Sequence, residues 1–530
     1  MQTKNKLIKS IRVIFFLTIS SYFSLNAIAK PLNLIQLDRI ATLTTKMTIP
    51  ELQDVMNNGE LTSLQLTQFY LQQIELKNLK LNAIISVLPN ALDNARMLDK
   101  ERANGKVRGA LHGIPIIIKD NIETKKVATT AGSLALKDNT TNRDATLIKN
   151  LKRAGAIILA KANLSEWANF RSERSSSGWS AIGGQTRNPH DLNRSPCGSS
   201  AGSAVAVAAN LAVAAVGTET DGSITCPASA VGVVGIKPTL GLVSRYRIIP
   251  IAETQDTAGS IAKSVLDASI VLAAMQGKDN ADLATKQRHF KFAEDYQKQT
   301  IAYPLKGLRI GLLKSQVHKH EGVDQVYQNA IEQLESAGAI IISGIENTRY
   351  KDFDKDHYNV LLHEFKYYIN KYLNSVPTSA HGMTLEKLIQ FNLDNADKEL
   401  AYFQQEIFVK AQEKGNLKSQ EYLDSLARIK RSTREDGLDK HFKELNLDVI
   451  ITPSLGPAWS IDLINGDQYT GGYSSYSAIS GYPYLTFPMG KVKYLPIGLS
   501  VLGLALDDAK IIEVAKQMEA LFDVDVSIKP

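Results

Sequence analysis

The chain has 530 residues, of which 44% are hydrophobic and 22% charged, a composition that indicates a folded globular protein and excludes a largely disordered one. The formal net charge is +7. Four of these charges belong to basic residues within the first twelve positions, so 7 − 4 leaves +3 for the rest, spread among acids, which argues against a nucleic-acid-binding surface.

The first 29 residues have the features of an export signal. A basic start without acids precedes an apolar stretch from Ile11 to Leu25, and Ala27-Ile28-Ala29 offers a small-x-small cleavage site. The apolar stretch contains Thr and Ser and is shorter than the roughly 20 residues that span a bilayer. We expect cleavage near Ala29 and an exported mature protein, periplasmic or secreted, with no stable membrane insertion; the alternative is an uncleaved anchor.

Beyond the leader, helical and strand-like patterns alternate. Residues 49–77 have helical periodicity with a capping Thr62-Ser63, and the order helix, glycine, apolar strand occurs twice. The helices of these two units are 147–154 and 323–337, and the strands are 156–160 and 339–342. Further strands are expected at 83–88, 114–119, 308–313 and 449–452. This alternation predicts an α/β protein, a sheet covered by helices.

Two regions stand out from this alternation. The alanine-rich run 201–217 predicts a tightly packed buried helix, because polar residues interrupt it and it is too short for a membrane span. Residues 352–443 are rich in Lys, Glu, Gln and Tyr and predict a helical cap, with helices over 358–373, 385–411 and 420–434. No Pro/Gly/Ser-rich linker separates the cap, so residues 30–530 are expected to form a single composite domain.

Residues 198–202 read GSSAG, which matches the G-x-S-x-G nucleophile elbow of esterases. An elbow serine follows a strand, whereas residues 188–196 hold two prolines among polar side chains and cannot form a central strand. The histidines at 357, 363, 381 and 441 all fall in the expected cap. The pattern therefore argues against Ser200 as the nucleophile of a Ser-His-Asp hydrolase.

A second group of small polar residues, 217–228, follows the alanine-rich run and contains Ser223. Taken alone it could be an ordinary turn. However, the strand 114–119 ends in Lys119 and is followed by Asp120-Asn121, at a position where α/β sheets present functional groups. Burial at such a position lowers the pKa of a lysine, which favours a neutral amine.

Several motifs together resemble the amidase signature family, and within it the bacterial peptide amidases. The resemblance covers nearly the whole mature chain. The matching segments are 113–121 (GIPIIIKDN), 159–167 (LAKANLSEW), 184–189 (GQTRNP), 197–203 (CGSSAGS), 217–228 (GTETDGSITCPA), Thr452-Pro453, 481–483 (GYP) and 487–490 (FPMG). The resemblance implies a mixed central sheet covered on both faces by helices, with no cofactor and no metal.

The resemblance also implies a Ser-Ser-Lys triad. Ser223 matches the nucleophile, Ser199 the bridging serine that follows a cis peptide bond, and Lys119 the base. Backbone N–H groups of Thr220, Asp221, Gly222 and Ser223 match the oxyanion hole, and Ser200 supports the hydrogen-bond network.

The chain departs from the family pattern next to this site. Asp221 stands where glycine is usual, Glu219 where aspartate is usual, and Thr225 where arginine often occurs. An Asp–Arg pair behind the nucleophile is therefore expected to be absent. Only two cysteines occur, Cys197 and Cys226; they flank the two serines, and a bridge and two buried thiols both fit the sequence.

The expected activity is hydrolysis of carboxamides to acid and ammonia, with the C-terminal amide of peptides as the substrate and a monomer as the working state. Aryl or aliphatic amides are the alternative within the family. A periplasmic peptide-binding protein would not need Lys119, Ser199 and Ser223 together. The enzyme component that amidates tRNA-bound glutamate shares the signature, but the leader and the absence of a basic surface argue against it.

Overall fold

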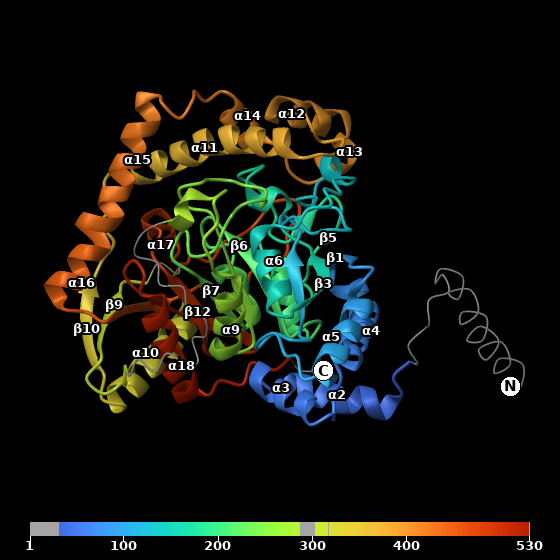
Figure 1. The fold of residues 1–530 in the computed structure, drawn as a ribbon. Helices are drawn as coiled ribbons and strands as arrows, with labels where there is room; N and C mark the ends of the chain where they lie inside the picture. Colours follow the sequence, from blue (N-terminus) through green and yellow to red (C-terminus); the bar gives the residue numbers. More distant parts are fainter. Residues whose placement is uncertain (1–30, 287–302, 316, 318, 529–530) are drawn as a thin grey trace, which may run out of the picture.

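A computed structural model describes residues 31–286, 303–315, 317 and 319–528. The expected leader, residues 1–29, lies outside these ranges. Helices flank a central mixed sheet, which has eleven strands in the described residues, in the order β1-β3-β2-β6-β8-β7-β12-β13-β11-β9-β10 (Figure 1). The predicted α/β class is confirmed.

The middle of the sheet carries the signature segments. Strand β2 (Pro115–Lys119) lies between β3 (Ile157–Ala162) and β6 (Ala214–Glu219), parallel to both. All residues of these three strands are buried, as expected for a parallel sheet covered by helices. Because β2 and β6 are parallel neighbours, their carboxyl ends, and with them Lys119 and Glu219, reach the same edge of the sheet.

The other strands form the two wings of the sheet. They are β1 (Ile84–Val87), β7 (Val234–Lys237), β8 (Thr257–Ala262), β9 (Arg309–Leu313), β10 (Ile340–Ile345), β11 (Val449–Pro453), β12 (Tyr484–Val492) and β13 (Leu495–Leu502). A separate two-stranded ribbon pairs β4 (Trp179–Ser180) with β5 (Gly184–Gln185). The strands predicted near 83–88, 114–119, 156–160, 308–313, 339–342 and 449–452 are therefore confirmed within a few residues.

Helices outside the cap cover the sheet and its ends. They are α2 (Leu34–Lys46), α3 (Ile49–Asn57), α4 (Ser63–Leu81), α5 (Ala91–Ala103), α6 (Thr146–Arg153), α7 (Ala201–Ala208), α8 (Thr225–Val231), α9 (Val265–Met275), α10 (Glu321–Ser336), α17 (Ser475–Ser480) and α18 (Asp508–Phe522). The predicted helical stretch 49–77 divides into α3 and α4, and Thr62 caps α4 by accepting from the Gln65 N–H. Among the described residues, no helix combines the length and hydropathy needed to cross a bilayer.

The expected helix over 201–217 is wrong in its second half. Helix α7 ends at Ala208, Asn210 adopts a left-handed φ of 58°, and the chain enters β6 at Ala214. The strand β6 pairs with β2 and β8 in the interior of the sheet, and all of its residues are buried. Buried strands and buried helices have the same continuous apolar pattern, so the sequence does not distinguish them.

The cap consists of α11 (Phe353–Ser375), α12 (Leu385–Asp394), α13 (Ala396–Glu399), α14 (Glu406–Gln412), α15 (Gln420–Thr433) and α16 (Asp439–Leu445). Figure 1 shows α11, α12 and α14 across one end of the sheet, with α15 and α16 descending along its side. The predicted single helix over 385–411 is wrong, since the chain breaks there into α12, α13 and α14. At the end of α13 the Glu399 carbonyl accepts from the Arg171 guanidinium, so this carbonyl is satisfied without a further helical turn.

Candidate active site

Lys119 is held in place by three hydrogen bonds at the end of β2. Its Nζ lies 2.8 Å from Ser199 Oγ, 2.9 Å from Thr218 Oγ1 and 3.1 Å from the Thr218 carbonyl oxygen. Asn121 also donates to Thr218 Oγ1, at 2.9 Å. The lysine side chain is fully buried, so its amine is directed at the Ser199 hydroxyl and nowhere into solvent.

The environment of Lys119 favours the neutral amine. Burial lowers its pKa from the ordinary value near 10.5 to about 7, although the negative charges of Glu219 and Asp256 act in the opposite direction. A lysine with a pKa near 7 is a suitable proton acceptor at neutral pH. The expectation of a neutral, buried lysine at this strand end is therefore supported.

Ser199 and Ser200 lie at the start of α7. The peptide bond between Gly198 and Ser199 is cis, as the family resemblance implied. The Ser200 hydroxyl is hydrogen-bonded to both backbone groups of Thr218, donating to its carbonyl at 3.1 Å and accepting from its N–H at 3.2 Å. Ser200 thus ties α7 to β6 and leaves Ser199 as the serine in contact with the lysine.

Ser223 lies on the turn between β6 and α8. Its carbonyl accepts from the Ser200 N–H at 3.0 Å, which brings the two serine segments into contact. Gly222 has a φ of 80°, in the left-handed region that glycine adopts without strain. Ser223 is 8% exposed, whereas Ser199 and Lys119 are completely buried, so Ser223 is the one of the three that a substrate can reach.

Glu219 supports the Ser223 turn from behind. One oxygen of its carboxylate accepts from the N–H groups of Ile224 and Thr225 at 2.8 and 3.0 Å, and from the Thr225 hydroxyl at 3.1 Å. The Thr225 hydroxyl also hydrogen-bonds to Tyr484 of β12. The Thr225 hydroxyl therefore contacts the Glu219 carboxylate, and the Tyr484 hydroxyl contacts Thr225 in turn.

Asp221 extends from the same turn to the start of α17. Its carboxylate accepts from the hydroxyls of Ser474 and Ser475, the latter at 2.8 Å. Asp221 is only partly buried, so its carboxylate is fixed in orientation while part of it remains accessible.

A third carboxylate, Asp256, fixes the beginning of the turn. It accepts from the Thr220 hydroxyl at 2.6 Å and from the Ile251 and Ala252 N–H groups at 2.8 and 3.0 Å. Burial raises the pKa of Asp256 to about 6, against these hydrogen bonds. The turn is thus held through Thr220 as well as through Glu219.

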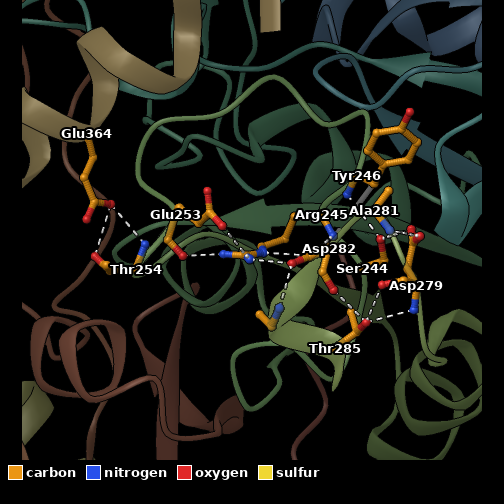
Figure 2. A network of polar contacts seen from close by, with 11 residues as sticks. Ser244, Arg245, Tyr246, Glu253, Thr254, Asp279, Ala281, Asp282, Thr285 and Glu364 are labelled. Atoms are coloured by element: carbon orange, nitrogen blue, oxygen red, sulfur yellow. Dashed lines mark hydrogen bonds and ion pairs between the residues drawn. The ribbon is translucent and has the colours of Figure 1, made fainter. Parts of the chain in front are cut away.

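Figure 2 shows polar contacts of Glu253 and Thr254, which belong to the loop before β8. Arg245 forms a bidentate ion pair with Asp282, at 2.6 and 2.9 Å, and donates to the Glu253 carbonyl. Glu364 of the cap helix α11 accepts from the Thr254 N–H at 3.0 Å. The loop therefore connects the cap to the Ser223 turn.

Cys197 and Cys226 form a disulfide. This settles the alternative left open by the sequence. The bridge joins the residue before Gly198 to the second residue of α8, and it lies among the apolar side chains of Ala230, Leu455, Ala458 and Trp459. The segments that carry Ser199 and Ser223 are therefore covalently linked.

A cavity of about 210 Å³ lies between the sheet edge and α11. Thr218, Thr220 and Asp256 line it on the side of the site, and Ile249 and Tyr368 contribute apolar surface. Across residues 31–286 and the other described ranges, no cluster of three or more His, Cys, Asp or Glu residues is arranged to hold a metal ion.

The Lys119 amine is thus hydrogen-bonded to the Ser199 hydroxyl, and the tight turn that carries Ser223 adjoins the Ser199 segment at the edge of the mixed sheet. The chain belongs to the amidase family: the family model Amidase matches residues 65–512. It is an amidase, a hydrolase acting on amide C–N bonds.

Similar solved structures agree in fold over almost their whole length. A peptide amidase in complex with the competitive inhibitor chymostatin is 43% identical, with a TM-score of 0.88, and the match covers 92% of this chain and 99% of that one. The native peptide amidase from Stenotrophomonas maltophilia is also 43% identical, with a TM-score of 0.87 over 91% and 98% of the two chains.

A curated relative is similar over most of its sequence as well. This protein, a probable amidase of Arabidopsis thaliana, is 39% identical over 482 residues, which cover 89% of each of the two proteins.

The structure brings together all the residues that sequence reasoning assigned to the site: Lys119, Ser199, Ser200, Thr220, Asp221, Gly222 and Ser223. Sequence reasoning did not identify Thr218, Asp256, Ser474 and Ser475 as parts of it. Thr218 lies within the motif 217–228, so its place beside β2 could have been inferred from strand pairing. Asp256 and the two serines carry no local signal, because folding alone brings them to the turn.

Proposed function

We propose that the chain hydrolyses carboxamides through an acyl-enzyme intermediate, with Ser223 as nucleophile, Ser199 as proton relay and Lys119 as base. The observation that carries this proposal is the 2.8 Å contact between Lys119 Nζ and Ser199 Oγ. A neutral amine there can accept the Ser199 proton while Ser199 accepts that of Ser223.

The proposed reaction has two halves. Ser223 Oγ attacks the amide carbon, its proton passes through Ser199 to Lys119, and the resulting ammonium returns a proton to the leaving nitrogen as the C–N bond breaks. Ammonia departs, and water then attacks the ester by the same relay to release the acid and regenerate Ser223. The backbone N–H groups of residues 220–223 are proposed to stabilise the oxyanion in both halves.

We propose peptides with a C-terminal amide as the substrates. The relatives described as peptide amidases support this, one of them solved with the inhibitor chymostatin. The cavity of about 210 Å³ beside Thr220 offers room for a side chain on the acyl side. Asp221, oriented by Ser474 and Ser475, is a suitable acceptor for the NH₂ group of a primary amide.

We also propose that the protein is exported and that its leader is removed near Ala29. The disulfide between Cys197 and Cys226 supports this, because structural disulfides persist mainly in oxidising compartments.

The test is ammonia release by the mature protein, residues 30–530, from a matched set of substrates. The set contains a peptide amide, the same peptide extended by one residue, an aryl amide and a fatty amide, with Ser223→Ala as the blank. Ammonia from the peptide amide, with little cleavage of the extended peptide, supports the proposal. Preference for the aryl or fatty amide would change the substrate class and leave the Ser223, Ser199 and Lys119 roles in place. Ammonia release by Ser223→Ala equal to that of the parent would overturn the nucleophile.

A further inference from the structure

We propose that Glu219 is a positioning residue of the reaction, one that holds the Ser223 turn through the start of α8. The inference rests on the proposed roles of Ser223 and Lys119. Glu219 is itself buried.

The geometry of the Glu219 carboxylate gives it control of the turn. Glu219 is the last residue of β6, and its Oε2 accepts three hydrogen bonds from Ile224 and Thr225. Residues 220–223 carry the expected oxyanion donors and the nucleophile. They form a short loop that the Glu219 side chain closes by bonding to the residues that follow it. Hydrogen bonds to a buried carboxylate are among the stronger ones in proteins, so this closure restricts the position of Ser223.

The same carboxylate acts on Lys119 through its charge. Glu219 and Asp256 are the acidic groups facing Lys119, and each raises its pKa against the effect of burial. Burial raises the pKa of Glu219 itself. The positive charge of Lys237 on β7 opposes this rise, and the negative charge of Asp221 adds to it. Neutralising Glu219 therefore removes one of the two negative charges that raise the pKa of Lys119.

Three variants separate the two effects. Glu219→Gln keeps the size and one acceptor oxygen but removes the charge. Glu219→Asp keeps the charge and shortens the side chain, so that it no longer spans the turn. Thr225→Val removes only the hydroxyl that donates to Glu219. Asp267→Asn is the matched control, because it neutralises another buried carboxylate, which accepts from the Ile49 N–H outside the site.

The readout is the rate at which Ser223 is labelled by an organofluorophosphonate, measured from pH 5 to 10. In this step Ser223 Oγ bonds to phosphorus, the P–F bond breaks, fluoride leaves and the proton passes to Lys119. Labelling requires no amide turnover, so a wrong substrate assignment and a wrong role for Glu219 give different results.

The labelling rate should fall at low pH as Lys119 becomes protonated, and we call this part of the profile the acid limb. We expect Glu219→Gln to move the acid limb to lower pH by at least about 0.5 unit, since loss of the negative charge lowers the pKa of Lys119. Its rate at the plateau should fall about tenfold because the turn is less well held. Glu219→Asp and Thr225→Val should lower the plateau and leave the limb in place, and Asp267→Asn should change neither.

Melting temperatures and circular dichroism establish that the compared variants are folded. A merely structural Glu219 would reduce the melting temperature and the labelled fraction while the acid limb stayed at the parental pH. That result, or a parental rate and limb in Glu219→Gln, would overturn the proposal. Failure of the parent enzyme to label at Ser223 would overturn it together with the proposed nucleophile.

Discussion

The Nζ atom of Lys119 lies 2.8 Å from the Oγ atom of Ser199, although the two residues are 80 positions apart in the chain. One comes from the end of β2 and the other from the start of α7, so the contact exists only because β2 and β6 are parallel neighbours with α7 packed beside them. Proton transfer between Ser199 and Lys119 therefore requires the folded chain. The first two predictions depend on this contact.

Activity should depend on the neutral form of Lys119. Its pKa is lowered to about 7 by burial, so the protonated and inactive form dominates below that pH. We expect kcat/KM to fall about tenfold per pH unit on the acid side and to reach a plateau above about pH 8. A pH series with an uncharged amide as substrate measures this. A profile that stays level from pH 5 to 9 would contradict a titrating lysine base.

Replacing the three residues singly and together should reveal that they act as a unit. Ser223→Ala should abolish turnover, and Ser199→Ala and Lys119→Ala should each lose several orders of magnitude in kcat. The double variant of Ser199 and Lys119 should be little worse than the worse single variant, because each change already breaks the same relay. Losses that add in free energy would indicate that the two side chains act independently.

The disulfide should contribute measurably to stability. It closes a loop between residues 29 positions apart, and loss of chain entropy in the unfolded state predicts about 3–4 kcal/mol for a loop of this length. The Cys197→Ala/Cys226→Ala double variant should therefore have a lower free energy of unfolding in urea by that amount. Addition of a reductant should destabilise the parent and leave the double variant unaffected. Equal stability of the two proteins would contradict the prediction.

The sequence predicts most of the strands that surround the site but not β6. Lys119 stands out as a charge that ends an apolar strand, and the two serine motifs are specific to one family. The strand β6, by contrast, was hidden inside an alanine-rich run, because a strand covered on both faces lacks the alternation that marks exposed ones.

The support of the site was less predictable still. Ser474 and Ser475 reach Asp221 from a segment about 250 residues further along the chain, and nothing in their local sequence marks them. The sequence expectation that no Asp–Arg pair stands behind the nucleophile did not indicate that the Glu219 side chain would bond back to Ile224 and Thr225. Such contacts depend on strand order, which periodicity does not encode.

Arg171 should anchor the cap to the segment that follows β3. Its buried guanidinium lies 2.6 Å from Glu166 and 3.4 Å from Glu399, and it packs on the Phe403 ring. Arg171→Met leaves these carboxylates buried without a cation, which costs about 3–5 kcal/mol. Urea unfolding of this variant and of the parent measures the difference.

The matched control is Arg349→Met, which breaks an ion pair with Asp354 whose side chains are 38% and 81% exposed. Exposed pairs contribute about 0–1 kcal/mol, so this variant should unfold close to the parental urea concentration. Equal destabilisation by the two variants would contradict the anchoring role.

Asp221 should determine the preference for primary amides. Its carboxylate is oriented by the hydroxyls of Ser474 and Ser475 and remains partly accessible beside the Ser223 turn. If it accepts a hydrogen bond from the substrate NH₂ group, Asp221→Asn, which places an amide there, should lower kcat/KM for a peptide amide by about 10- to 100-fold.

The matching peptide methyl ester has no NH₂ group to hold, so its hydrolysis should fall much less. Ser475→Ala removes one orienting hydroxyl and should show the same selectivity at smaller amplitude. Equal losses on amide and ester in Asp221→Asn would mean that Asp221 merely caps the turn, and the basis of amide selectivity would then lie in the walls of the cavity beside Thr220.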